Sequence, residues 1–171
     1  DEGDIESAVR SLQEAVRQQP DYVRSYEALA MLLYQLGRVP DAAVVYARWA
    51  EREPSNPKAR HMLAATSLRE VPSRAPDDYV QHLFDESAKS FDENVETLRY
   101  RAHNLVADAL VRCASGSTLD TVLDAGCGTG LCGSLIRSHC RRLVGVDLSP
   151  KMIERARARR IYDELAAAEL C

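Results

Sequence analysis

Residues 121–130 read Thr121-Val-Leu-Asp-Ala-Gly-Cys-Gly-Thr-Gly130, and residues 143–150 read Leu143-Val-Gly-Val-Asp-Leu-Ser-Pro150. The first stretch is a short aliphatic run that enters a glycine-rich turn, and the second is an aliphatic run that ends in a carboxylate. A helix-like segment, residues 131–139, separates them. This order of strand, glycine loop, helix, strand and acidic residue is typical of a parallel α/β sheet, which binds ligands at the carboxyl ends of its strands.

Three cofactors compete for such a loop: a nucleoside triphosphate, a dinucleotide and S-adenosylmethionine. The loop lacks the Gly-Lys-Ser/Thr sequence with which a Walker loop binds phosphate and magnesium. Its glycines, Gly126, Gly128 and Gly130, are spaced G-x-G-x-G and not G-x-G-x-x-G as in a dinucleotide loop. Asp124 would repel a pyrophosphate, whereas S-adenosylmethionine carries a cationic ammonium and a cationic sulfonium. The residues therefore favour S-adenosylmethionine.

The second strand ends in Asp147, whose carboxylate is placed to accept hydrogen bonds from both ribose hydroxyls. This role is shared with dinucleotide folds, so it does not discriminate between the cofactors. Ser149 and Pro150 have the residue types of a helix N-cap and a first helical position. Met152 then falls in the first helical turn, where its thioether is able to pack on adenine.

The segments Val122–Gly130 and Gly145–Met152 resemble those of class I, Rossmann-like S-adenosylmethionine-dependent methyltransferases. The resemblance implies a seven-stranded sheet flanked by helices. It also implies that Asp124 meets the methionine end of the cofactor and that Asp147 holds the ribose. The predicted cofactor-binding residues are Asp124, Ala125, Gly126, Cys127, Gly128, Gly130, Asp147, Leu148 and Met152, with Gly126 and Gly128 beneath the cofactor and Leu148 and Met152 beside adenine.

The chain departs from this family after Leu165, because residues 165–171 supply a third strand at most. We therefore expect a longer natural protein, and we expect this chain alone to be inactive. No catalytic base is identified in the sequence. Tyr79 and His82 are named as candidates only because they fall in a segment that we expect to cover the cofactor.

The first seventy residues repeat with a period of 34, which is typical of helix-turn-helix repeats. The register places Gly3, Ala8, Leu12 and Pro20 opposite Gly37, Ala42, Tyr46 and Pro54. Helices are predicted over residues 23–35 and 40–53, with a third unit after Pro57 and turns at the two glycines. These residues resemble tetratricopeptide repeats, which usually hold a peptide or partner protein. The alternative is that so short an array is a structural appendage.

A proline-punctuated linker is predicted from Arg69 to Asp78, followed by one long or two short helices over residues 79–95 and a helix over residues 98–113. The helical stretch carries two Phe-Asp pairs, Phe84-Asp85 and Phe91-Asp92. The predicted domains are repeats over 1–70, a linker and lid helix over 71–96, and an incomplete methyltransferase domain over 97–171. The fold class is thus α/β with an all-α N-terminal part. The combination is similar to bacterial methyltransferases that carry tetratricopeptide repeats.

Composition gives no support for some partners. The net charge of −4 and pI near 5.6 give no support for nucleic acid, and no apolar run is long enough for a membrane span. The five cysteines show neither C-x-x-C nor zinc spacing, so we expect reduced thiols, no metal and a cytoplasmic location. The basic run Arg155–Arg160 is interpreted as a solvated helix face.

The leading hypothesis is S-adenosylmethionine-dependent methyl transfer to a small-molecule or protein acceptor, with the repeats assisting acceptor or partner binding. A second hypothesis is a tetratricopeptide scaffold with a Rossmann-like part that binds a ligand without catalysis. A third is a dinucleotide-binding oxidoreductase, against which Asp124 and the loop spacing argue.

Overall fold

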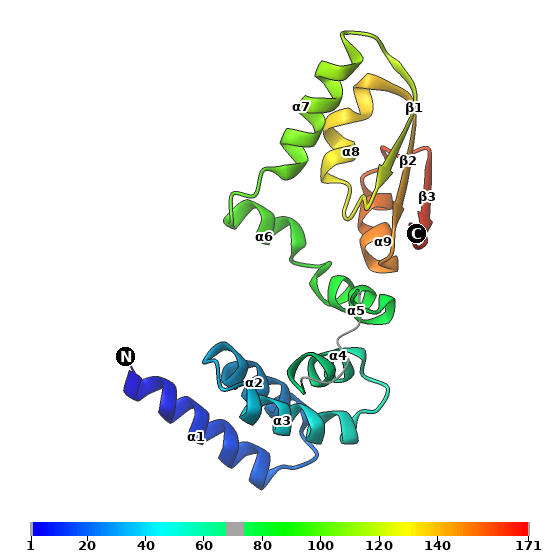
Figure 1. The fold of residues 1–171 in the computed structure, drawn as a ribbon. Coiled ribbons are helices and arrows are strands. Elements are labelled where there is room, and N and C mark those ends of the chain that lie inside the picture. The colour runs from blue at the N-terminus through cyan, green and yellow to red at the C-terminus, as the bar shows by residue number, and fades with distance from the viewer. Residues whose placement is uncertain (1, 68–73, 171) are drawn as a thin grey trace. The chain divides into compact units, whose positions relative to one another are not determined.

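The computed structural model describes residues 2–67 and 74–170, and it divides into two compact units between Tyr79 and Val80 (Figure 1). Part of the predicted linker, residues 68–73, lies outside the described residues, as does Cys171. The predicted division of the chain at residues 70 and 96 stays a prediction. Each unit is described by itself below.

The first unit is helical, as predicted. It consists of α1 (Glu2–Gln18), α2 (Val23–Gln35), α3 (Val39–Arg52) and α4 (Pro57–Thr66). Gly37 has φ of 72° and forms the turn between α2 and α3. The prediction of a turn at Gly3 is wrong, because this residue lies in α1; the first turn of a helix tolerates glycine since its amides have no partner within the helix. Asn56 caps α4 by accepting hydrogen bonds from two amides of the first turn.

The core of the first unit lies between the apolar faces of α1 to α4. Alanines at the contacts let the helix backbones approach closely, and larger rings fill the remaining space. Tyr46 and Trp49 of α3 stack with ring centroids 6.2 Å apart. The buried set is Val9, Tyr26, Leu29, Ala30, Leu33, Ala42, Tyr46, Trp49 and Ala59. The predicted apolar face of residues 23–35 is thus buried, apart from Tyr34, which is exposed.

Two short helices, α5 (Asp77–Ser87) and α6 (Phe91–Thr97), form where one long or two short helices were predicted. The next helix, α7 (Ala102–Ala114), begins four residues later than predicted, because Arg99 takes a left-handed φ of 51° and interrupts the helical path. It ends as predicted at a turn in which Ser115 and Gly116 both have positive φ.

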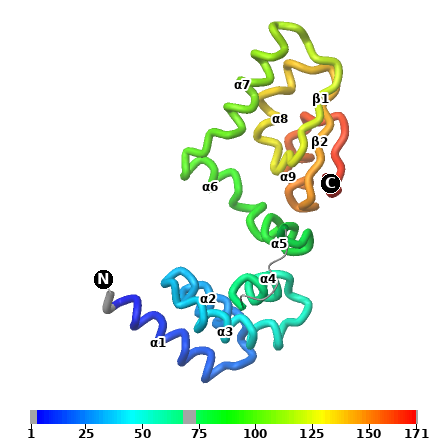
Figure 2. Tube along the Cα trace, viewed as in Figure 1, coloured from blue at the N-terminus to red at the C-terminus, as the bar shows by residue number. Residues whose placement is uncertain are grey.

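The sheet of the second unit has three parallel strands in the order β1-β2-β3: β1 (Leu119–Ala125), β2 (Cys140–Asp147) and β3 (Glu164–Ala167). The crossovers contain α8 (Leu131–Ile136) with a short 3₁₀ turn (Arg137–His139), and α9 (Pro150–Ala158). Both crossovers advance in the same direction, so the right-handed rule places α8 and α9 on one face of the sheet. Figures 1 and 2 show α7 beside α8 on this side. The predicted fold class is confirmed.

The covered face of the sheet holds the core of the second unit, and the opposite face, here called the open face, carries exposed side chains among the described residues of this unit. Leu143 of β2 is 0% exposed and packs with buried Ala107, Ile136 and Cys140. Leu123 of β1, whose side chain points to the other face, is 57% exposed. The parallel register brings the carboxyl ends of β1 and β2 to the same edge, with Ala125 opposite Val146.

This difference between faces predicts the result of a matched pair of substitutions. Leu143→Ala removes a fully buried side chain, and we expect it to lower the free energy of unfolding by about 2–5 kcal/mol. Leu123→Ala makes the same change on the open face, where we expect a loss below about 1 kcal/mol. Urea unfolding followed by circular dichroism measures both. Equal losses would contradict the assigned core.

Candidate functional site

The loop after β1, residues 126–130, is built from left-handed glycines. Gly126, Gly128 and Gly130 have φ of 73°, 54° and 88°, which only glycine adopts readily. The amides of Gly126 and Cys127 both donate to the Val146 carbonyl oxygen, at 2.8 and 3.0 Å, and attach the loop to β2. A Cβ built on Gly126 or Gly128 meets nothing within 4 Å. The backbone of these two residues therefore forms a ledge that borders open space.

Asp147, at the end of β2, lies directly against this ledge. Its Oδ2 accepts a hydrogen bond from the Gly128 amide at 2.8 Å, and its Oδ1 accepts one from the Ser149 amide at 2.8 Å. Ser149 caps α9 as predicted, since its Oγ accepts from the Met152 amide at 3.1 Å and Pro150 follows it. A carboxylate has about four lone-pair sites, so Asp147 retains acceptor capacity for the hydroxyls of a ligand.

Asp124 has a different environment, because its carboxylate accepts from a side-chain hydroxyl. Its Oδ2 accepts from the Tyr162 hydroxyl at 2.6 Å. Burial raises the pKa of Asp124, the Tyr162 hydroxyl and the Gly133 amide oppose this rise, and the negative charge of Asp147 adds to it. Burial and the Asp124 carboxylate in turn raise the pKa of Tyr162, so this residue remains a neutral donor. A direct contact of Asp124 with the cofactor stays a prediction.

Tyr162 occupies a slot made of three glycines, which the sequence reasoning missed. A Cβ on Gly133 of α8 would lie 2.1 Å from the Tyr162 hydroxyl oxygen, and one on Gly145 of β2 would lie 2.9 Å from its Cε1. A Cβ on Gly130 would lie 3.0 Å from Cε2. A glycine inside a helix or a strand often marks a close approach, and Gly133 and Gly145 carried that signal.

The remaining predicted binding residues have varied exposure. Ala125 is exposed at the end of β1, Leu148 is half-buried, and Met152 is only 1% exposed. The predicted packing of Leu148 and Met152 beside adenine stays a prediction. Burial, together with the charges of Asp124 and Asp147, raises the pKa of Cys127 to about 12. This thiol is therefore protonated at neutral pH and is unsuited to act as a nucleophile, in keeping with its interpretation as a small loop residue.

Two aspartates outside the sheet also contact the site, and neither was predicted to do so. Asp92 of α6 binds Thr129 in the glycine loop and Arg159 at the end of α9. Asp85 of α5 binds Ser149. The interpretation of residues 155–160 as a solvated face is wrong for Arg159, because its half-buried guanidinium pairs with Asp92.

The two candidate bases, Tyr79 and His82, each contact another side chain. Tyr79 stacks on His61 with ring centroids 3.9 Å apart, and His82 Nε2 lies 3.5 Å from an oxygen of Glu86. Neither arrangement identifies a proton acceptor for a reaction at the glycine loop.

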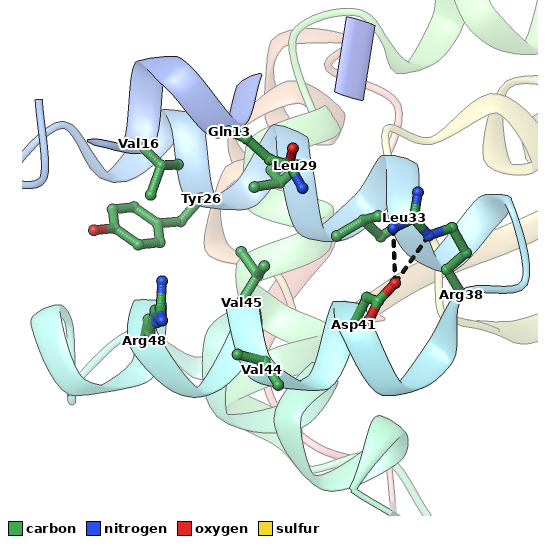
Figure 3. Close-up of a pocket in the computed structure, with 10 residues that line it drawn as sticks. All are labelled: Gln13, Val16, Tyr26, Leu29, Leu33, Arg38, Asp41, Val44, Val45 and Arg48. Atoms are coloured by element: carbon green, nitrogen blue, oxygen red, sulfur yellow. Dashed lines mark hydrogen bonds and ion pairs between the residues drawn. The ribbon is translucent and has the colours of Figure 1, made fainter. Parts of the chain in front are cut away.

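A second candidate surface lies in the first unit, where α1, α2 and α3 enclose a hollow of about 300 Å³ (Figure 3). Tyr26, Leu29 and Val45 give it an apolar wall. Arg38 and Asp41 form an ion pair at 2.8 Å on its rim. Apolar and charged side chains both line this hollow, so it is a candidate binding surface.

Among residues 2–67 and 74–170, no cluster of His, Cys, Asp or Glu is arranged to hold a metal ion. Within the same described ranges, no helix is both long and apolar enough to cross a membrane. The cytoplasmic location stays a prediction.

Comparison with known proteins supports both halves of the sequence analysis. Residues 1–57 match the family model of the tetratricopeptide repeat, and residues 122–170 match that of a methyltransferase domain. Methyltransferase-like protein 27 of Homo sapiens is 38% identical over 91 residues, which cover 52% of this chain and 37% of the relative. An uncharacterized methyltransferase of Schizosaccharomyces pombe is 38% identical over 82 residues, 48% of this chain and 27% of the relative. The match thus spans about a third of the length of these relatives.

The raised pKa of Asp124 predicts how this residue affects stability at different pH. Because the folded state holds the proton more tightly than the unfolded chain, its contribution is complete below pH 3.8, the ordinary value, and is lost as the pH rises through the folded pKa. The unfolding free energy of the wild type minus that of Asp124→Asn should therefore fall as the pH rises above 3.8.

Urea unfolding at a series of pH values measures this difference. Asp120→Asn, an exposed change in the same strand, serves as the control and should show no such fall. A difference that rises with pH would show that Asp124 is stabilised in its charged form.

Proposed function

We propose that this chain, which joins a tetratricopeptide repeat segment to part of a class I methyltransferase domain, binds S-adenosylmethionine where the glycine loop meets Asp147. One observation carries the proposal: the 2.8 Å hydrogen bond from the Gly128 amide to the Asp147 carboxylate. It brings the glycine backbone of the ledge and the Asp147 carboxylate together at the carboxyl edge of parallel strands, where such sheets bind ligands.

The charges at the site support this cofactor over a dinucleotide. Asp147 is close enough to Asp124 for its negative charge to raise the pKa of Asp124. The Asp124 carboxylate complements the cationic sulfonium and ammonium of S-adenosylmethionine, and it would repel a pyrophosphate. The Arg159 guanidinium near the loop donates to Asp92 and to the Thr129 carbonyl oxygen, so these donors are already engaged.

The residues present fit the cofactor in distinct roles. Gly126 and Gly128 lack a Cβ where the cofactor would lie on the ledge, and Asp147 has lone pairs left for the ribose hydroxyls. Asp124 would contribute negative charge, and Leu148, which follows Asp147 in the chain, would pack beside adenine. S-adenosylmethionine supplies the methyl group, and the protein's contribution is mainly to align the acceptor with it.

We further propose that the complete protein transfers this methyl group to a small-molecule or protein acceptor, with the first unit contributing to recognition. Support for the second part comes from the hollow lined by α1, α2 and α3 and from the tetratricopeptide match, since such repeats generally bind proteins. The α2–α3 hairpin offers this hollow a charged rim at Arg38 and Asp41.

Isothermal titration of the full chain with S-adenosylhomocysteine tests the cofactor site. We expect micromolar binding, because the loop ledge and Asp147 are already formed in this structure. Asp147→Asn removes the charge and one acceptor oxygen, and we expect it to weaken binding by at least about tenfold. The control Asp120→Asn makes the same chemical change at an exposed position in β1 and should leave the dissociation constant unchanged.

A reduced nicotinamide dinucleotide serves as the competing ligand in the same titration. Binding of the dinucleotide with no binding of S-adenosylhomocysteine would support the oxidoreductase hypothesis. Binding of neither ligand by a folded protein would remove the methyltransferase proposal and leave a repeat scaffold as the better account.

A further inference from the structure

The two Phe-Asp pairs, Phe84-Asp85 and Phe91-Asp92, lie on consecutive short helices, α5 and α6, outside the sheet. We propose that Asp85 and Asp92 are positioning residues, which hold the two loops of the cofactor site in the conformation that binds the ligand. The expected effect of these residues on ligand affinity rests on the proposed function. Their expected effect on the order of the two loops is a property of the ligand-free protein and is tested separately.

Asp92 holds the glycine loop through Thr129. Its Oδ1 accepts from the Thr129 hydroxyl at 2.5 Å, and its Oδ2 accepts from Arg159 Nη2 at 2.5 Å. Arg159 Nε donates in turn to the Thr129 carbonyl oxygen at 2.6 Å. The Thr129 hydroxyl is therefore bound by the Asp92 carboxylate, and the Thr129 carbonyl is bound by the Arg159 guanidinium. The carboxylate and the guanidinium also pair with each other.

Asp85 makes the corresponding contacts at the second loop. Its Oδ1 accepts from the Ser149 hydroxyl, and the Lys151 amide donates to the same oxygen at 3.2 Å. Ser149 is the N-cap of α9 and is 0% exposed. The Asp85 carboxylate also lies at the N-terminus of α9, where the helix dipole favours a negative charge.

The two sets of contacts meet at the candidate ribose-binding residue. The Ser149 amide donates to Asp147 Oδ1, and the Gly128 amide donates to Asp147 Oδ2. Thr129 follows Gly128 directly. A continuous path of hydrogen bonds and one peptide link therefore runs from Asp85 through Asp147 to Asp92.

The backbone between the two aspartates also contacts α9. Arg155 Nη2 approaches the Lys89 carbonyl oxygen at 3.4 Å, and Arg159 lies one helical turn further on. Residues four apart on a helix share a face, so one face of α9 lies along the α5–α6 turn. Ala88 in this turn is buried, in keeping with a packed contact.

Loss of these contacts is costly in free energy, because the hydroxyls that make them are buried. Thr129 is 1% exposed, so a hydroxyl that loses Asp92 has little access to water and leaves a donor unsatisfied. The loop also contains three glycines with positive φ, and glycine loses more conformational freedom on ordering than any other residue. Ordering the loop before the ligand arrives removes part of that entropy cost from binding.

Hydrogen–deuterium exchange of the ligand-free full chain tests loop order directly. In Asp92→Ala we expect amide exchange over residues 126–130 to rise at least about tenfold, because the loop loses its charged partner. In Asp85→Ala we expect the rise at residues 149–152. Glu93→Ala, an exposed change next to Asp92 in α6, is the matched control and should leave both segments unchanged. Asp92→Asn retains an oxygen that accepts from Thr129, so we expect a smaller rise in exchange over residues 126–130. This variant keeps the test valid if Asp92→Ala fails to fold.

Titration with S-adenosylhomocysteine tests the coupling to binding. We expect Asp92→Ala and Thr129→Val each to raise the dissociation constant about tenfold, and the double variant to be no weaker than Asp92→Ala, because Asp92→Ala already removes the bond that Thr129→Val removes. Thr129→Ser retains the hydroxyl and should restore binding to within about twofold of the wild type. A general loss of structure would not be reversed by this conservative change.

The outcomes separate the two proposals. Unchanged loop exchange in folded Asp92→Ala, or additive effects of the two single substitutions on binding, would overturn the positioning role. If the wild type does not bind S-adenosylhomocysteine, the proposed function fails, and the exchange experiment alone still decides whether the aspartates order the loops.

Discussion

The contact on which the second unit depends is the hydrogen bond between the Gly128 amide and the Asp147 carboxylate. It joins the turn after β1 to the end of β2, and it requires a left-handed glycine at position 128. The parallel register aligns the two strands so that both end at the same edge. Since Asp147 also binds the Ser149 amide, one carboxylate determines the positions of the glycine loop and of the start of α9.

The sequence predicted this part because its signals are local. Strand, glycine spacing and acidic residue stand in order between residues 121 and 147, and the Ser149-Pro150 pair predicted the start of α9. The repeat helices were predicted for the same reason, since their apolar residues follow the helical period within thirteen or fourteen residues.

The contacts that the sequence did not predict join residues that are far apart along the chain. Tyr162 and Asp124 are separated by 38 residues, and Thr129 and Asp92 by 37. Periodicity reports which face of a helix is buried, but it does not identify the partner. Arg159 shows this limit. The basic run over residues 155–160 suggests a solvated surface, and only the fold shows that Arg159 pairs with Asp92 of α6.

The slot around Tyr162 has a consequence for how related chains can vary. An alanine at position 133 would place a methyl group 2.1 Å from the tyrosine hydroxyl oxygen, a distance at which the two groups cannot coexist. A homologue with a side chain at position 133 must therefore carry a smaller residue at position 162, turn the Tyr162 ring aside or shift its backbone. In that homologue the carboxylate at position 124 would lose its phenol donor and take another partner. Side-chain volume at positions 133, 145 and 162 is thus expected to covary.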